Sequence, residues 1–197
     1  YIVWHTEGLI RHDLTKGPLI LIGEYRTLRS DEGATQIFVH SAGNPNHFVA
    51  TAQAFEQLSL NVVDARIVTA DGDEVFNTFL VLEGNGQPVG ERPARCRDIT
   101  ETLNAFLTGK VRRSGRRRPS TAMKSFQFKT SVTLSADTTN NRTVVEVISP
   151  DRPGLLATIA RVFVDLGVVL RSARITTLGE RVEDMFYVTD LEGNAFH

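Results

Sequence analysis

The sequence predicts an α+β fold made of two tandem ferredoxin-like units, each an antiparallel sheet with helices on one face. The main observation is an internal repeat: residues 58–69 (LSLNVVDARIVT) reappear as residues 166–177 (LGVVLRSARITT), about 108 residues later. The flanking sequence repeats as well, because residues 37–41 correspond to residues 145–149. A duplicated unit of this length, with the same order of elements each time, points to tandem small domains.

Apolar spacing and turn residues predict the elements of the first unit in chain order. Asn44-Pro45 ends a strand and opens a helix, since proline suits the first helical turn, and Asp71-Gly72 is a hairpin turn. Cys96 lies on an apolar stripe at helical spacing, so we interpret it as a small core residue. The predicted elements are strands 35–41, 61–70, 75–82 and 126–135 and helices 45–58 and 96–106. This β-α-β-β-α-β order is ferredoxin-like.

The second unit follows the same order but stops before a second helix and a last strand. Such a truncated sheet would expose apolar surface and unpaired backbone, so we expect the strand at residues 19–22, or another chain, to fill a gap. The predicted elements are strands 143–149, 168–177 and 181–190 and helix 153–166. We divide the chain into residues 1–32 (a linker with a strand), 33–136 (the first unit, with a basic linker at 109–123) and 141–197 (the second, incomplete unit).

Composition excludes several classes of function. The chain is 41% hydrophobic with a formal net charge of -1, which gives no general attraction for nucleic acid or an anionic membrane. The single cysteine excludes a disulfide framework and a cysteine zinc site, and is compatible with the cytoplasm. No apolar run approaches the roughly 20 residues that span a bilayer. An RNA-binding sheet is disfavoured because Phe38 and Phe79 lie in apolar surroundings typical of a core.

No catalytic or metal site is predicted. His12-Asp13 resembles a metal-binding pair, but a lone dipeptide lacks the further histidines and aspartate that such a site needs, so we assign it a structural role. The five arginines between residues 112 and 118 are expected to stay solvated, with contact to an acidic partner as the alternative.

The sharpest local signal is the segment 150–156 (PDRPGLL), between a predicted strand and a predicted helix. Asp151 can accept hydrogen bonds from a cationic group, Pro153 fixes φ at the helix start, and Gly154 permits close approach. The free amides of the first turn, near Gly154 and Leu155, form an anion site. A carboxylate beside amide donors suits an α-amino acid; the alternative is a capped loop that binds nothing.

This motif, followed by an amphipathic helix, Leu-Gly and a second strand, resembles an ACT domain, the ferredoxin-like module that senses amino acids. The two copies together resemble the C-terminal tandem ACT region of the bifunctional uridylyltransferase/uridylyl-removing enzyme family. Residues 179–184 (GERVED) are the most specific part of the likeness. The leading segment, residues 1–32, resembles the stretch that joins the hydrolase domain of that family to its first ACT copy.

The resemblance implies a larger cytoplasmic enzyme whose catalytic domains are absent from these residues. In that family a transferase domain, expected to use magnesium and UTP, attaches UMP to the PII nitrogen-signalling protein, and an HD-type hydrolase domain removes it. Glutamine would bridge the two ACT copies, favour one relative orientation and bias the enzyme toward removal. No cofactor is expected in this chain, and ACT pairing allows a homodimer. A tandem ACT regulator of a biosynthetic enzyme or of transcription is the alternative.

In ACT families the ligand often lies between the loop of one module and a strand of its neighbour. We therefore expect one good glutamine site per chain, formed by Asp151, Arg152, Gly154, Leu155 and Asn61. A reciprocal site from Asn44, Asn46 and Val169 would be poorer in polar groups. The alternative for Asn61 is a cap on the preceding helix, and His47 is expected to be partly exposed and to cap its helix locally.

Overall fold

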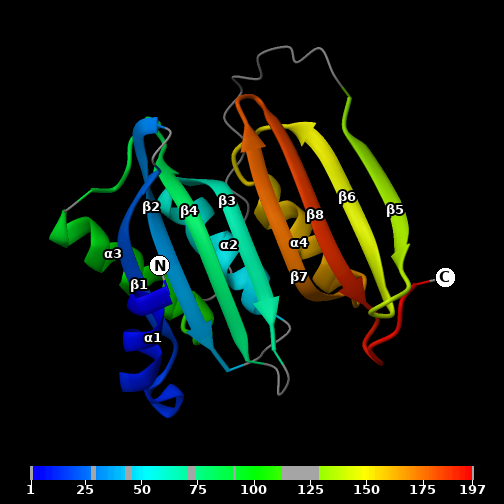
Figure 1. Ribbon diagram of the computed structural model, residues 1–197, viewed down its shortest axis with the longest axis horizontal. Coiled ribbons are helices and arrows are strands. Elements are labelled where there is room, and N and C mark those ends of the chain that lie inside the picture. Colours follow the sequence, from blue (N-terminus) through cyan, green and yellow to red (C-terminus); the bar gives the residue numbers. More distant parts are fainter. Residues whose placement is uncertain are drawn as a thin grey trace.

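The computed structural model describes residues 2–27, 30–42, 46–70, 74–90, 92–111 and 129–196. Its strands form one antiparallel sheet in the order β1-β2-β4-β3-β7-β8-β6-β5, with the first unit in one half and the second unit in the other (Figure 1). The strands are β1 (Leu19–Thr27), β2 (Ser30–Ser41), β3 (Leu60–Thr69), β4 (Val75–Glu83), β5 (Ser131–Asp137), β6 (Arg142–Pro150), β7 (Val169–Leu178) and β8 (Arg181–Thr189). The helices are α1 (Ile2–Arg11), α2 (His47–Leu58), α3 (Pro93–Leu107) and α4 (Leu155–Asp165), with a short 3-10 turn, η1 (Leu14–Lys16).

The α+β class and the two repeated units are confirmed. Each helix and strand expected inside the repeats is present, and most bounds agree to within two residues. The helix α1 was missed, because its residues were interpreted as a linker. The predicted hairpin turn at Asp71-Gly72 and the arginines between 112 and 118 lie outside the described residues.

The strand predicted at residues 126–135 exists in part, but it belongs to the second unit and not, as predicted, to the first. Residues 131–137 form β5, which pairs with β6 in the second unit, while residues 126–128 lie outside the described part. The expectation that residues 19–22 fill the gap in the second unit is wrong: they lie in β1, which pairs with β2 as the fourth strand of the first unit, and β5 completes the second. The unit boundaries at 33–136 and 141–197 therefore change: β1 belongs to the first unit and β5 to the second.

Local chain geometry explains why β5 pairs with β6. The two strands are consecutive and are joined by a short turn in which Asn141 has φ 50, a conformation that asparagine tolerates better than most residues. Arg142 then forms an ion pair of 3.2 Å with Asp137 across the end of the hairpin. A hairpin closes a much shorter loop than a crossover to the first unit would, so its entropic cost is lower.

The second unit carries less helical cover than the first. In the first unit α3 buries Ile99 and Leu103 completely. In the described part of the second unit α4 is the only helix, and five large apolar side chains are more than half exposed: Val132 (60%), Leu134 (68%), Leu166 (70%), Leu178 (57%) and Leu191 (72%). The expectation of exposed apolar surface in this unit is confirmed, although its sheet has four strands.

The core continues across the two units. Phe55 packs edge-on against Phe79 with ring centroids 4.9 Å apart, and Phe163 packs in the same way against Phe186 at 5.2 Å, at repeat-equivalent positions. Phe48 of α2 also reaches Phe186 of the second unit, at 6.1 Å. Because α2 and α4 contact each other, both units bury their apolar faces in one continuous core.

The two units are joined by antiparallel pairing of β3 with β7, which are equivalent strands of the repeat. Arg66 pairs with its own repeat equivalent, Arg174, at the centre of the ladder. The hydroxyl of Thr69 donates to the carbonyl of Leu170 at 3.5 Å, and that of Thr177 donates to the carbonyl of Val62 at 3.3 Å. Thr69 and Thr177 are repeat equivalents, as are Val62 and Leu170, so each contact is the counterpart of the other. The two units are therefore related by an approximate two-fold axis.

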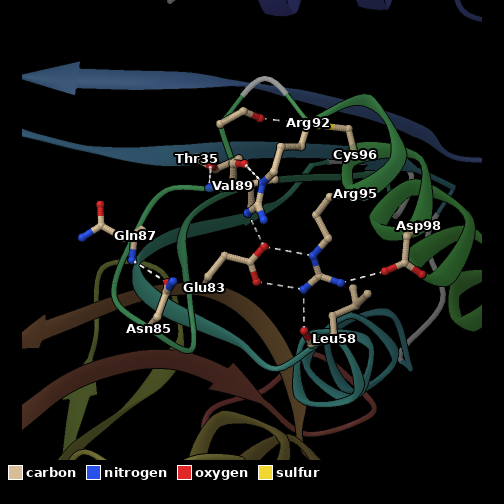
Figure 2. A network of polar contacts seen from close by, with 11 residues as sticks. Thr35, Leu58, Glu83, Asn85, Gln87, Val89, Arg92, Arg95, Cys96 and Asp98 are labelled. Carbon is tan, nitrogen blue, oxygen red and sulfur yellow. Dashed lines mark hydrogen bonds and ion pairs between the residues drawn. The ribbon is translucent and has the colours of Figure 1, made fainter.

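A partly buried ion-pair network fastens α3 to the turn between α2 and β3 (Figure 2). The guanidinium of Arg95 donates to both carboxylate oxygens of Glu83 at 3.0 Å and to the carbonyl of Leu58 at 2.6 Å. These hydrogen bonds lower the pKa of Glu83, and Arg92 adds a further ion pair at 2.8 Å. The network therefore fixes the point at which the chain leaves α2 and enters β3.

In the described residues no helix is long and apolar enough to cross a membrane. The His12-Asp13 pair has the structural role expected of it: Asp13 caps η1 by accepting from the Thr15 amide at 3.0 Å, and the His12 ring bonds the carbonyl of Gly17 at 2.8 Å.

Replacing Arg95 with methionine should lower the free energy of unfolding by about 1–3 kcal/mol, because Glu83 and the Leu58 carbonyl lose a charged donor. The lowered pKa of Glu83 means that this stabilisation is present above the ordinary pKa of a glutamate and is lost as the pH falls through the lowered value. Urea unfolding of the wild type and the variant should therefore differ at pH 7 and converge in acid. Arg97→Met, on the exposed face of α3, is the control; equal losses in both variants would contradict the prediction.

Candidate functional site

A cleft with a free volume of about 60 Å³ opens where the two units meet. One wall comes from α2 and the start of β3 in the first unit. The other wall comes from the β6–α4 loop, the first turn of α4, and strands β7 and β8 of the second unit. The lining residues are Ala52, Phe55, Glu56, Leu60, Asn61 and Val62 of the first unit, and Asp151, Arg152, Pro153, Gly154, Leu155, Leu156, Ala157, Ile175, Thr177, Val182 and Asp184 of the second.

The structure brings together five of the predicted ligand-binding residues. Asp151, Arg152, Gly154 and Leu155 of the second unit line the same cleft as Asn61 of the first. Which of these side chains contacts a ligand stays a prediction.

The predicted reciprocal residues lie elsewhere. Asn46 borders a second cavity of about 320 Å³ between α2 and the end of α3, inside the first unit, together with His47. Asn44 lies outside the described residues. The expectation that His47 is partly exposed is wrong: it is buried, its Nδ1 lies 2.6 Å from the Ser41 hydroxyl, and burial lowers its pKa.

The β6–α4 loop presents a helix N-terminus to the cleft. The backbone N–H of Asp151 donates to Glu180 at 2.9 Å, which holds the loop against the turn between β7 and β8. Gly154 is the N-cap residue of α4 with φ 75, and it has no side chain to accept from the helix amides. The N–H of Leu155 donates to Arg152 at 3.2 Å, so this amide is already engaged. The amides of the next two cleft-lining residues, Leu156 and Ala157, have no intrahelical acceptor and suit an anionic group.

Carboxylates line the same cleft, and the sequence analysis missed the most buried one, Asp184. Asp184 is 2% exposed, and its Oδ1 has no hydrogen-bond partner. Burial, with a smaller contribution from the nearby Asp151 carboxylate, raises its pKa to about 7, against a hydrogen bond from the Thr176 amide. Desolvation also raises the pKa of Asp151 at the cleft mouth. The cleft therefore favours a cationic group beside these carboxyls.

The sequence does contain a signal for Asp184. In β8 the inward positions Val182, Phe186 and Val188 alternate with outward ones, and Asp184 falls on the inward series. A charged residue at an apolar strand position is unusual unless a partner or a function requires it.

Glu56 of the first unit lies directly over Gly154 of the second. A Cβ placed on Gly154 would come within 2.7 Å of Oε1 of Glu56. Since Gly154 has φ 75, its backbone conformation favours glycine here, and the Glu56 carboxylate packs against the position where a Cβ would lie. Glu56 adds a third carboxylate to the lining of the cleft.

Asn61 is exposed on β3 and does not cap α2. The last carbonyls of α2 accept hydrogen bonds from the Ser59 amide and from Arg95. These two donors fill the capping role considered for Asn61. Asn61 instead lines the wall of the cleft.

Residues 143–195 match the model of the ACT domain family. The second unit is an ACT domain. Because the first unit repeats its sequence pattern and its order of strands and helix, the chain contains two ferredoxin-like ACT units in tandem.

Curated relatives match almost the whole chain. Over 97% of its length it is 42% identical to the bifunctional uridylyltransferase/uridylyl-removing enzyme of Stutzerimonas stutzeri (strain A1501). Over 96% of its length it is 41% identical to the enzyme of the same name from Azotobacter vinelandii (strain DJ / ATCC BAA-1303), and 39% identical to that from Pseudomonas syringae pv. syringae (strain B728a). The chain spans 21% of the length of each of these relatives, so it matches one region of those larger proteins.

The geometry of the cleft suits binding of a small molecule with both charges. Orphan amides of α4 and three carboxyl groups line the same cleft, and the two ACT units each contribute a wall. Among the described residues no group of three or more His, Cys, Asp or Glu side chains is arranged to hold a metal ion.

Replacing Gly154 with alanine should lower the free energy of unfolding by about 1–2 kcal/mol, because alanine is strained at φ 75. The carboxylate of Glu56 is the far end of a flexible side chain and can swing aside. Gly167→Ala is the matched control, since Gly167 has φ 67 and nothing closer than 3.9 Å, and it should cost about the same in urea unfolding. A much larger loss for Gly154→Ala would show that Glu56 is held rigidly against the loop.

Proposed function

We propose that the cleft between the two ACT units binds a free α-amino acid, and that the chain is the amino-acid-sensing region of an enzyme that adds and removes uridylyl groups. The supporting observation is the charge arrangement of the cleft. The α4 amides offer donors for the ligand carboxylate, while Asp151 and its acidic neighbours offer acceptors for the ammonium group.

The size of the cleft supports a small ligand. A buried water needs about 10–15 Å³ of such volume, so 60 Å³ holds roughly four or five waters. This is close to the size of the ammonium, Cα and carboxylate of one amino acid. We infer that this head group enters the cleft and that the side chain extends toward the mouth, where Arg152 and Asn61 are exposed.

We further propose glutamine as the ligand and the PII signalling protein as the substrate of the larger enzyme. The relatives are named for transfer and removal of uridylyl groups, and glutamine and PII follow from the family resemblance. The transferase domain, with magnesium and UTP, and the hydrolase domain would belong to other parts of that enzyme. Glutamine bound here would favour removal over transfer only through unequal affinity for two conformations. A cytoplasmic location and pairing into a homodimer belong to the same proposal.

Isothermal titration calorimetry on this chain tests the proposal. Glutamine should bind at one site per chain, and Asp151→Ala should weaken binding about 10- to 100-fold, the range expected for a hydrogen bond to a charged group. Asp165→Ala, at the exposed end of α4, is the control and should bind normally. A thermal-shift screen of the twenty amino acids identifies the preferred ligand.

Two outcomes would contradict the proposal. Two equally tight sites per chain would mean that the cleft is not the distinctive site. Unchanged glutamine affinity in Asp151→Ala would mean that the loop does not hold the ligand.

A further inference from the structure

We propose that Asp184, at the buried end of the cleft, accepts the ammonium group of the bound amino acid and thereby sets the preference of the site for α-amino acids. This inference rests on the proposed function and adds a residue outside the predicted ligand set. Its first support is geometry: Asp184 is nine-tenths buried, lines the cleft, and has an oxygen without a partner. A buried carboxyl with an unused acceptor is costly unless a ligand completes it.

The ladder between β7 and β8 is interrupted beside Asp184. Paired positions of β7 and β8 continue through Arg174 and Met185 and resume only at Thr177 and Val182. Asp184 lies in this interruption, and its carboxyl takes the Thr176 amide as a donor. At this point the Thr176 amide bonds to the side chain of Asp184, which lines the cleft.

The first unit shows that folding does not require a carboxyl at this position. Asn77 on β4 is the repeat equivalent of Asp184 on β8. Phe79 and Phe186 are equivalent, and Asn77 and Asp184 each lie two residues before them. Asn77 is 1% exposed, and the ladder is continuous at this position, with Ile67 paired directly to it. The fold thus accepts a neutral amide of the same shape, and the charged version occurs in the unit that forms the wall of the cleft.

Charge decides which ligand group fits. The other charged groups that line the cleft are Glu56, Asp151 and Arg152, contributed by α2 and the β6–α4 loop, while the lining residues of β7 are uncharged. Three carboxyls against one exposed guanidinium favour a cation. The free oxygen of the buried carboxyl can accept one of the three N–H donors of an ammonium group.

Calorimetry on the whole chain with two ligands tests the assignment. L-Glutamine and its analogue without the α-amino group, 4-carbamoylbutanoate, differ only in the ammonium. Asp184→Asn should weaken glutamine binding at least tenfold and leave the affinity for the analogue unchanged or higher. Asp64→Asn is the control, because desolvation raises the pKa of Asp64 as well, yet this residue does not line the cleft.

The pH dependence of binding gives a second readout. An ionised Asp184 binds an ammonium better, and its pKa is about 7, so glutamine affinity of the wild type should rise about tenfold from pH 6 to pH 8. The rise should disappear in Asp184→Asn and persist in Asp64→Asn. Carboxyl ¹³C NMR of the wild type, which needs no variant to fold, should show the pKa of Asp184 falling when glutamine is added.

The outcomes separate the two proposals. Equal losses for glutamine and the analogue in Asp184→Asn, an unchanged pH profile in that variant, or an Asp184 pKa that ignores glutamine would overturn this inference and leave amino-acid sensing intact. A wild-type chain that binds none of the twenty amino acids would overturn the proposed function and this inference with it.

Discussion

The antiparallel pairing of β3 with β7 is the constraint on which the rest of the structure depends. It sets equivalent strands of the two ACT units side by side, so that α2 and α4 pack against each other over one sheet. The β6–α4 loop of the second unit then lies against the end of α2 and the start of β3 in the first. The cleft exists because of this register: a shift of one residue would turn the strand faces over and separate its two walls.

An approximate two-fold arrangement offers two equivalent positions, and the side chains make them different. Where the second unit has Leu155 at the helix start, the first has His47, whose buried ring is bonded to Ser41. Where the second unit has Asp184 beside an interruption of its ladder, the first has Asn77 in a directly paired position. The two differences leave the helix start and the buried carboxyl open to the cleft in the second unit only, so the duplication has specialised one of the two positions.

The repeat, the types of the elements inside it and those cleft residues that belong to local motifs could be predicted from the sequence. These features depend on periodicity and on turn chemistry. The strand partners of β1 and β5 could not be derived in the same way. Either β1 or β5 could complete the four-stranded sheet of the first unit. Which of them does so depends on loop closure and on long-range register. Asp184 and Glu56 show the same limit at the site: their importance comes from burial and from a neighbour in the other unit, which a local pattern does not contain.

The continuous sheet also restricts how a ligand could change the conformation of this region. Rotation of one unit against the other would disrupt the five paired positions between β3 and β7, and each net hydrogen bond contributes about 0.5–1.5 kcal/mol. A ligand that prefers one state 100-fold supplies only about 2.7 kcal/mol, which reaches only the low end of that cost, so a change of relative orientation across the ladder is disfavoured.

Smaller movements keep the ladder intact. Glu56 lies on α2 directly over the β6–α4 loop, and the carbonyl at the end of α2 is bonded to Arg95 of α3 (Figure 2). A ligand that displaces Glu56 would act on α2, and the Arg95 network would carry that displacement to α3 on the far side of the first unit. We therefore expect the response to pass from the cleft through the helices, while the shared sheet stays fixed as the frame against which they move.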